Sequence, residues 1–560
     1  MTEKIAIVVR GGFGWADSIG NDAISQYRTL SSFSRTPAEV RIFAETVPHD
    51  RDPAIPVEPI GALTAWAGRD RDITIIYHWC DSWPGFDRWL PEVNARVIIR
   101  WHNNTPPWFF ARYSTIAVAN TVRGFRGILT LATAAQFEFW ANSAYSARQL
   151  AVLGIAAGRV RVVYPASAYL EAPYPEAPRQ APAPAGPADR PVRLLFVGRV
   201  VPHKGHKHLI AAAALLKPGL RREVELILPG RFEPVSGYVA ELKDLARLAG
   251  VRLVLRGEVS RDALAALYTG CDVFVCLSEH EGFGLPVFEA MRMGLPVVGL
   301  RSTAFSEFLR GHPLAADEMD YVKIAARIIA ALDPAIREPV LGWQRAHLGE
   351  FYSAAIVRRQ ITGALAGQPE IPAPAIPADA ALNARVAATA AAWEAKLRPA
   401  FDRMPPLHGI PADTIDRYVT RHDIEAFERF CPAEPTSALF GNVMATRFGS
   451  ARPVIGPVLR LARRLALSLH SGLLTGLSIM DGRISHRFDS LEHSVAILQA
   501  SLDDLRGSRQ GLNEAPAPCP ACGATAAPDC PGKPGATPDS ADAPVAGEPP
   551  AQLFPRRKTG

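Results

Sequence analysis

Two stretches of this chain alternate short apolar runs with segments of helical length. Apolar runs without a polar face indicate strands that are buried on both sides, and their alternation with helices is typical of parallel sheets covered by helices. We therefore predict two Rossmann-like, doubly wound α/β domains that face each other across a cleft. The expected strands are 5–9, 72–77, 95–100 and 159–164 in the first stretch, and 193–197, 223–228, 252–255, 272–277 and 296–300 in the second.

Proline marks the expected domain boundaries. The chain has 49 prolines in 560 residues, well above the usual share of about 5%. They gather in segments that are rich in alanine and poor in large apolar side chains, which cannot offset the entropy of ordering. We predict an N-terminal Rossmann-like domain (1–170), a linker (171–190), a C-terminal Rossmann-like domain (191–366), a second linker (367–380), a helical extension (381–510) and a disordered tail (511–560).

Composition narrows the location and the partners. A net charge of +6 over 560 residues is mild, so we expect no nucleic-acid partner. The seven cysteines are scattered, which favours a reducing compartment over a disulfide framework. The first residues do not form a signal peptide, and no apolar window of about 18 residues predicts a membrane span. We expect a cytoplasmic protein.

The most specific motif follows the expected strand at 272–277 and leads into a helix. It reads Glu281-Gly282-Phe283-Gly284-Leu285-Pro286 and continues to Glu289. Two glycines before a helix start let backbone N–H groups approach a diphosphate closely. Glu289 could bind neighbouring ribose hydroxyls, and Glu281 could face a reacting sugar. Alternatively, Glu289 is an ordinary helix-dipole partner and Glu281 a solvated loop charge.

The two glutamates separated by seven residues resemble the signature of family GT4, the glycosyl transferases group 1. These are retaining, nucleotide-sugar-dependent enzymes of the GT-B fold, and the resemblance spans about residues 1–365. The segment 196–205 resembles the family's Gly-Arg…Lys-Gly element. The resemblance implies that Arg199 and Lys204 neutralise the donor diphosphate, although both could be surface charges. It also implies no metal and no cofactor beyond the nucleotide-sugar donor.

The first domain resembles a bacterial subgroup that builds O-antigen and related surface polysaccharides. The matching motifs are Tyr77-His78-Trp79 and His102-Asn103-Asn104-Thr105-Pro106-Pro107, with Gly20-Asn21-Asp22-Ala23 as a less exact match. The resemblance implies that His102 contacts the donor sugar or its developing charge, and that Asp22 and His78 lie on the acceptor side. The alternative is that these are structural residues, with His102 bonded to backbone at a strand end. Gly12 and Gly14 stand where the family has glycines near the donor phosphate, a weak signal by itself.

The reaction implied is transfer with retained anomeric configuration to a polysaccharide or lipid-linked glycan, as in O-antigen or lipopolysaccharide synthesis. His102 and Glu281 are the expected catalytic residues, with Glu281 in a positioning and electrostatic role. Two alternatives stay open: another GT-B nucleotide-sugar enzyme of the epimerase kind, and a non-catalytic scaffold in a polysaccharide assembly complex.

Three features follow the paired domains. Residues 452–470 carry four arginines and no acid on an amphipathic pattern, which suits peripheral contact with an anionic membrane or, alternatively, a core-packed helix. A heptad seam at 484–505 predicts a homo-oligomeric coiled coil, or a helix packed on its own chain. Cys519, Cys522 and Cys530 resemble half a zinc ribbon, but a fourth ligand is missing nearby.

Overall fold

The computed structural model describes most of the chain up to residue 430. The described residues are 4–10, 18–33, 39–47, 55–67, 73–166, 190–233, 236–370, 378–404, 407, 410 and 417–430. Several predicted features lie outside them and stay predictions: Gly12 and Gly14, almost all of the 171–190 linker, the segments 452–470 and 484–505, the three C-terminal cysteines, and the tail.

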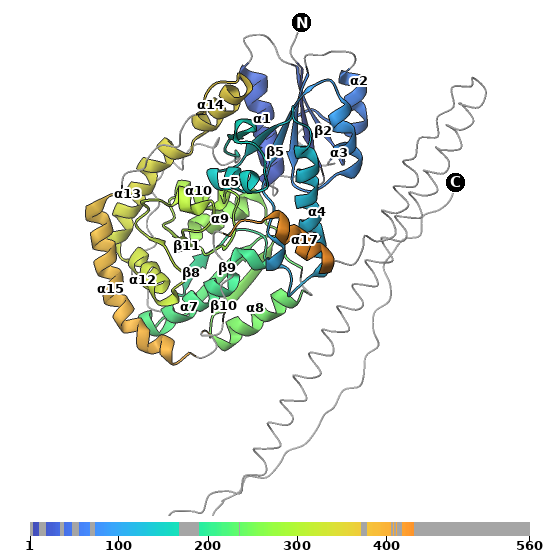
Figure 1. The fold of residues 1–560 in the computed structure, drawn as a ribbon. Helices are drawn as coiled ribbons and strands as arrows, with labels where there is room; N and C mark the ends of the chain where they lie inside the picture. The colour runs from blue at the N-terminus through green and yellow to red at the C-terminus, as the bar shows by residue number, and fades with distance from the viewer. Residues whose placement is uncertain are drawn as a thin grey trace, which may run out of the picture. The chain divides into compact units, whose positions relative to one another are not determined.

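The N-terminal domain is built on a parallel sheet that has seven strands among the described residues, in the order β3-β2-β1-β4-β5-β6-β7. Alternate residues of β1 enter different core clusters: Ile7 lies in one with Ile24, and Val8 in another with Phe125. Both faces of the sheet are therefore covered by helices (Figure 1). The elements are β1 (Lys4–Val9), α1 (Ser18–Phe33), β2 (Glu39–Ala44), β3 (Val57–Pro59), η1 (Ile60–Ala62), α2 (Leu63–Ala67), β4 (Ile73–Trp79), α3 (Pro84–Trp89), η2 (Leu90–Glu92), β5 (Arg96–Trp101), η3 (Pro107–Phe109), α4 (Thr115–Ala132), β6 (Glu138–Ala141), α5 (Ala144–Val152), η4 (Ala157–Arg159) and β7 (Val160–Val162).

The C-terminal domain repeats this plan. Its parallel sheet has six strands among the described residues, in the order β10-β9-β8-β11-β12-β13. The predicted fold class is thus confirmed: two doubly wound α/β domains. The elements are β8 (Val192–Leu195), η5 (Pro202–Lys204), α7 (His206–Leu220), β9 (Val224–Pro229), α8 (Gly237–Leu248), β10 (Arg252–Gly257), α9 (Arg261–Gly270), β11 (Val273–Cys276), α10 (Leu285–Arg292), β12 (Val297–Leu300), α11 (Phe305–Phe308), β13 (Ala315–Ala316), α12 (Tyr321–Leu332), α13 (Pro334–Phe351) and α14 (Ala354–Leu365).

Two helices beyond the paired domains return to them. Helix α15 (Ala380–Asp402) packs against α12 and α7 of the C-terminal domain, whereas α17 (Arg421–Phe430) packs against α4 of the N-terminal domain (Figure 1). The Gln149 side chain binds the backbone of Val419 twice, as acceptor and as donor, both at 2.8 Å. The segment that begins at 381 therefore contacts both domains. No helix among the residues described is both long and apolar enough to cross a bilayer.

Candidate active site

The loops after β8 and β11 are fastened to each other at the carboxyl edge of the C-terminal sheet. The N–H of Glu279 donates to the carbonyl of His203 over 2.9 Å. Gly205 has a φ of 67°, and a Cβ there would lie 2.0 Å from the carbonyl oxygen of Leu277, so only glycine fits. This contact holds Lys204, the last residue of η5, beside the loop that follows β11.

Lys204 and Glu281 form an ion pair in that position. The Lys204 Nζ donates to Glu281 Oε2 over 2.7 Å, and the Glu281 N–H donates to Thr303 Oγ1 over 2.9 Å. The Glu281 side chain is 10% exposed, so it is a buried, paired carboxylate and not a solvated loop charge. Arg199, by contrast, is exposed and forms no ion pair with any residue that the structure describes.

Helix α10 starts from a backbone geometry that requires glycine. Gly284 has a φ of 86°, and a Cβ there would lie 2.4 Å from the ring of Phe305. Glu289, one turn into the helix, accepts a hydrogen bond from the buried Tyr268 hydroxyl over 2.9 Å. The side chains of Phe283 and Leu285 are buried in the core, so these two predicted donor residues offer a ligand only their backbone.

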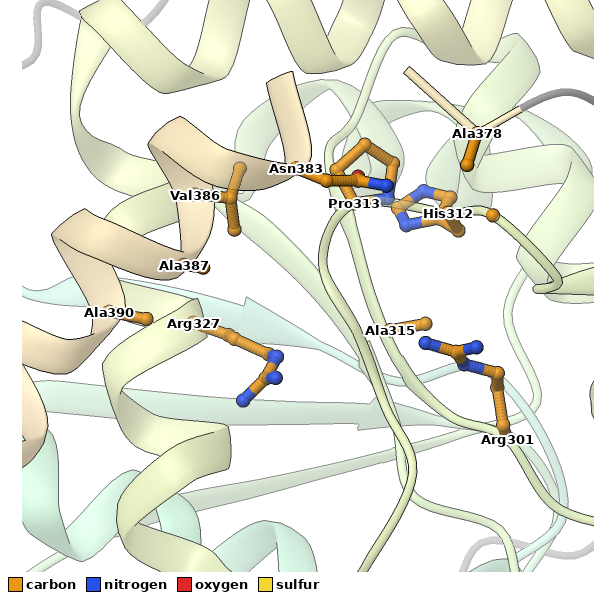
Figure 2. A pocket seen from close by; sticks show the side chains of 11 residues that line it. Arg301, His312, Pro313, Ala315, Arg327, Ala378, Asn383, Val386, Ala387 and Ala390 are labelled. Atoms are coloured by element: carbon orange, nitrogen blue, oxygen red, sulfur yellow. The ribbon is translucent and has the colours of Figure 1, made fainter. Parts of the chain in front are cut away.

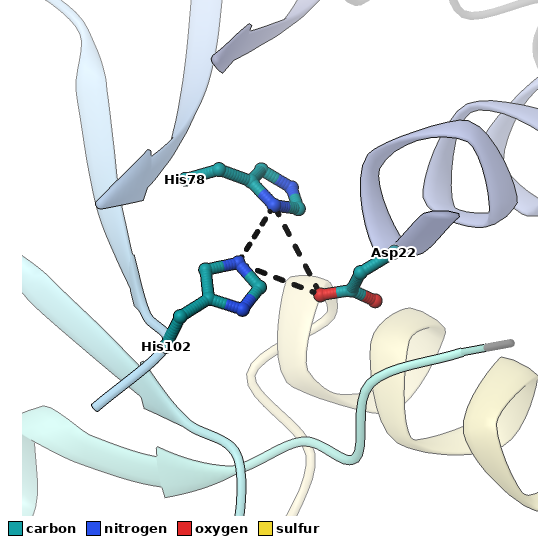
Figure 3. Close-up of side chains that lie close together, drawn as sticks. All are labelled: Asp22, His78 and His102. Carbon is teal, nitrogen blue, oxygen red and sulfur yellow. Dashed lines mark hydrogen bonds and ion pairs between the residues drawn. The ribbon is translucent and has the colours of Figure 1, made fainter. Parts of the chain in front are cut away.

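In the N-terminal domain, Asp22, Gln26, His78 and His102 form a buried hydrogen-bonded chain. Figure 3 shows Asp22 and the two histidines close together. Gln26 Nε2 donates to Asp22 Oδ2 over 3.3 Å, and Gln26 Oε1 lies 3.1 Å from His78 Nε2. His78 Nδ1 lies 2.9 Å from His102 Nε2. Arg100 Nε closes the arrangement by donating to Asp22 Oδ2 over 2.8 Å. Helix α1 supplies Asp22 and Gln26, β4 supplies His78, β5 supplies Arg100, and His102 directly follows β5.

The direction of this chain assigns the histidine tautomers. Because Gln26 donates to Asp22 with its amide nitrogen, its oxygen accepts the Nε2–H proton of His78. His78 Nδ1 is then an acceptor, and His102 Nε2 carries the proton that it accepts. His102 Nδ1 is left with its lone pair available for a ligand.

Burial keeps both rings neutral. The pKa of His78 is lowered to about 4, mainly by desolvation, with Asp22 raising it and the nearby Arg100 guanidinium adding to the decrease. The pKa of His102 lies well below its ordinary value, first through burial and then through His78 and Arg100. Both rings must be neutral for this bond, because His78 Nδ1 can accept the proton of His102 Nε2 only when Nδ1 is itself unprotonated.

The same cluster is the group of side chains that could hold a metal ion in the described part of the chain. One ligand atom each from Asp22, His78 and His102 lie within 4.8 Å of one another, and a His₂Asp set suits zinc. The Arg100 guanidinium already binds the Asp22 oxygen, and the two histidine nitrogens bind each other. An ion would have to replace both interactions.

Loops of the two domains meet between these clusters. Asn103 Nδ2 lies 3.1 Å from His280 Nε2, and Ser143 Oγ donates to the carbonyl of Gly282 over 2.8 Å. A Cβ on Gly282 would lie 2.9 Å from the Cβ of Asn103. The residue after His102 therefore touches the loop that carries Glu281.

The structure groups the predicted residues in two clusters: Asp22, His78 and His102 on one domain, and Lys204, Glu281 and the adjoining Gly282 on the other. Glu289 is bound by Tyr268 instead. Sequence reasoning missed Gln26, Thr303 and Tyr268. Gln26 had a detectable signal, because it follows Asp22 by four residues and shares its helix face. Thr303 and Tyr268 come from other elements and carry no motif.

Two doubly wound domains whose carboxyl-end loops meet are the arrangement of the GT-B fold. Residues 179–336 match the model of the family described as glycosyl transferases group 1. This segment of the chain is similar to the glycosyl transferases group 1 family.

Two curated relatives illustrate the similarity. The chain is 34% identical over 138 residues to an O-antigen chain mannosyltransferase B of Escherichia coli, covering 25% of this chain and 36% of the relative. It is 35% identical over 223 residues to a D-inositol 3-phosphate glycosyltransferase of Geodermatophilus obscurus, covering 38% of this chain and 48% of the relative. The matches thus span less than half of each of these two relatives.

Among solved structures, a sucrose-phosphate synthase from Thermosynechococcus elongatus superposes with a TM-score of 0.51 at 18% identity. The superposition covers 65% of this chain and 98% of the other. At this identity the likeness shows the shared fold alone.

Proposed function

We propose that this chain is a retaining glycosyltransferase that moves a sugar from a nucleoside-diphosphate donor to a polysaccharide or lipid-linked glycan. The observation that carries the proposal is the contact between the His102–Asn103 loop and the Glu281–Gly282 loop, since it brings a neutral histidine beside a lysine and a helix start. The printed name of the E. coli relative, O-antigen chain mannosyltransferase B, supports an O-antigen type of acceptor.

The C-terminal domain would bind the leaving diphosphate. Lys204 is fixed by Glu281 at 2.7 Å, and Arg199 is exposed at the same loop, so two cations are available to the phosphates. The N–H groups around Gly284 add the positive end of the α10 dipole. Fixed charges of this kind stabilise a leaving group without reorganising as charge develops. Glu289 would bind the ribose hydroxyls.

The N-terminal domain would orient the sugar. The free lone pair at His102 Nδ1 can accept a hydrogen bond from a sugar hydroxyl, and the neutral ring adds no charge that would repel an oxocarbenium-like centre. Glu281 is held by Lys204 and Thr303, which suits positioning better than covalent attack. The acceptor hydroxyl then attacks from the face that the diphosphate leaves.

A thermal-shift panel of GDP-, UDP-, ADP- and dTDP-linked sugars tests the proposal. One donor class should raise the melting temperature in proportion to its binding, and free nucleoside diphosphate should appear with a glycan acceptor. Glu289→Ala should weaken that donor by about 10- to 100-fold, because bonds to a carboxylate contribute about 1.5–3 kcal/mol. The exposed α13 variant Glu338→Ala is the matched control.

Each alternative has its own outcome in that panel. A chain that binds no nucleotide sugar would be a scaffold, and one that converts the donor sugar without an acceptor would be an epimerase. Unchanged donor affinity in Glu289→Ala would remove this residue from the ribose site.

We also propose that the transfer needs no metal ion or other cofactor. The two cations at Arg199 and Lys204 would take the place of a divalent ion at the diphosphate. Activity should be unchanged by EDTA in an assay of nucleoside-diphosphate release. Loss of activity that Mg²⁺ or Zn²⁺ restores would contradict this, and Zn²⁺ rescue would direct attention to Asp22, His78 and His102.

A further inference from the structure

A cavity of about 330 Å³ lies between the edge of the C-terminal sheet and helix α15 (Figure 2). Arg301, which follows β12, and Arg327 on α12 contribute its charged side chains. Asn383, Val386 and Ala387 of α15 line it from the helix side. None of these residues belongs to the two clusters of the candidate active site.

The cavity has more positively charged than negatively charged side chains around it. No acidic side chain lines it among the described residues. Arg327 donates to the backbone carbonyl of Lys323 over 3.2 Å, forms no ion pair with a described carboxylate, and has a buried Nε without a hydrogen-bond partner. Arg301 has one carboxylate neighbour, Asp317, at 3.1 Å, and that side chain is 71% exposed. A guanidinium held at a partly buried site without a carboxylate partner, as Arg327 is among the described residues, favours a bound anion.

The other residues that line the cavity restrict the rest of the ligand, beyond its anionic group. His312 adds no charge, since burial lowers its pKa to about 4 and its ring nitrogens face Leu314 N–H and Gln344 Oε1, each at 3.2 Å. The buried oxygen of Asn383 lacks a hydrogen-bond partner. The α15 wall is aliphatic, and His312 is the cavity's single ring that could stack among the lining residues described. A small uncharged body fits such walls better than a nucleobase.

We propose that this cavity binds a small phosphate-bearing molecule, with the phosphate between Arg301 and Arg327 and a compact aliphatic or hydroxylated body against α15. Guanidinium groups from two elements can each donate two N–H bonds to the tetrahedral oxygens of one phosphate. The volume is at the lower end of small-ligand sites, which suits a glycerol phosphate or a lipid headgroup. Because the ligand would touch both α12 and α15, its binding would fasten the extension to the C-terminal domain.

Titration calorimetry of the full chain with inorganic phosphate and glycerol 3-phosphate, at constant ionic strength, tests the site. Glycerol 3-phosphate should bind saturably and more tightly than phosphate. Arg327→Gln should weaken it at least 10-fold, whereas Arg358→Gln, an exposed arginine on α14, should not change it. Ala387→Leu, which fills the cavity from the helix and leaves the charges intact, should weaken binding as well.

Absence of saturable binding by either compound, or equal affinity in wild type and both cavity variants, would overturn the proposal. Vesicles of phosphatidylcholine with and without phosphatidylglycerol distinguish the two sources of the phosphate. Phosphatidylglycerol-dependent binding that Arg327→Gln reduces assigns a lipid headgroup. Vesicle binding that is equal in wild type and variant, beside the expected glycerol 3-phosphate titration, assigns a free phosphate ester.

Discussion

At the scale of single residues, the tautomer of His102 is determined by buried side chains that do not contact the other domain's Glu281–Gly282 loop in any bond described above. The proton on its Nε2 follows from His78, whose own proton follows from Gln26, which in turn is oriented by Asp22. Each step depends on a donor facing an acceptor. Asp22, three hydrogen bonds away, therefore determines which nitrogen of His102 carries the proton.

This chain of bonds predicts a specific effect of Gln26→Met. Removing the amide leaves His78 free to take either tautomer, so His102 Nδ1 should be protonated in part of the molecules. Nitrogen-15 NMR of the histidine rings should show one tautomer of His102 in wild type and a mixture in the variant, with kcat lowered about tenfold. Gln368→Met, at an exposed position, serves as the control. An unchanged His102 spectrum would contradict the assignment.

Sequence predicted the residue types of the site better than their partners. Lys204 and Glu281 were identified in separate motifs as a phosphate ligand and a positioning carboxylate, but their ion pair spans 77 positions. Arg100 lay only within the predicted strand 95–100, and its bond to Asp22, 78 positions away, was not predicted. Such pairs depend on which strands become neighbours, which local pattern does not specify.

At the scale of elements, the loop after β11 combines two requirements for small residues. Gly284 needs a positive φ to start α10, whereas Gly282 needs close approach to the other domain, since its absent Cβ would lie 2.9 Å from Asn103 and 3.3 Å from the His102 carbonyl. The first requirement concerns the donor site alone, and the second concerns contact between the domains.

Gly282→Ala should separate these two requirements. The added methyl pushes the His102 loop away, so kcat should fall by up to about 100-fold while the donor-induced thermal shift stays near wild type. Gly342→Ala in α13 meets nothing within 4 Å and should instead stabilise the fold by up to about 1 kcal/mol without affecting transfer. A Gly282→Ala enzyme with wild-type kcat would show that this approach is not needed for the reaction.

All nine predicted strands correspond to observed strands, including the edge strands β7 and β10. Of these, β1, β4, β5 and β11 are buried almost throughout. Strands β2, β3, β6 and β13 were not predicted. Glu39 and Arg41 interrupt the apolar run of β2, and β13 has only two residues, so neither gives a continuous hydrophobic signal.

At the scale of the whole molecule, the segment after residue 380 contributes to both domains, since α15 packs on α12 and α17 on α4. Proline-rich composition predicted a boundary near 367–380, but it carried no information on where the chain goes next. That path depends on buried contacts such as Val419 and Ile424, which are fully enclosed in the N-terminal core cluster.

Buried histidines make the stability of the paired domains sensitive to acid. Six of them have a pKa below the ordinary value of 6.5, and desolvation by burial is the largest cause in each: His78, His102, His203, His206, His280 and His312. The unfolded chain binds a proton at each of these rings below about pH 6.5, whereas the folded chain does not until about pH 3–4 where a value is resolved. Stability is therefore complete above pH 6.5 and is lost as the pH falls through that window.

The slope of this loss gives the last prediction. Each histidine removes about 1.4 kcal/mol per pH unit in the window, so the six should lower the urea midpoint steeply between pH 6.5 and 5. Asp87 and Glu307 oppose them, because burial raises the pKa of both carboxyls, but they are fewer.

In His312→Gln the slope of unfolding free energy against pH should flatten by about 1.4 kcal/mol per unit, even if the variant is less stable at neutral pH. His422→Gln, at an exposed position, should leave the slope unchanged. A midpoint that stays constant from pH 7 to 5 would mean that these rings are not held neutral by the fold.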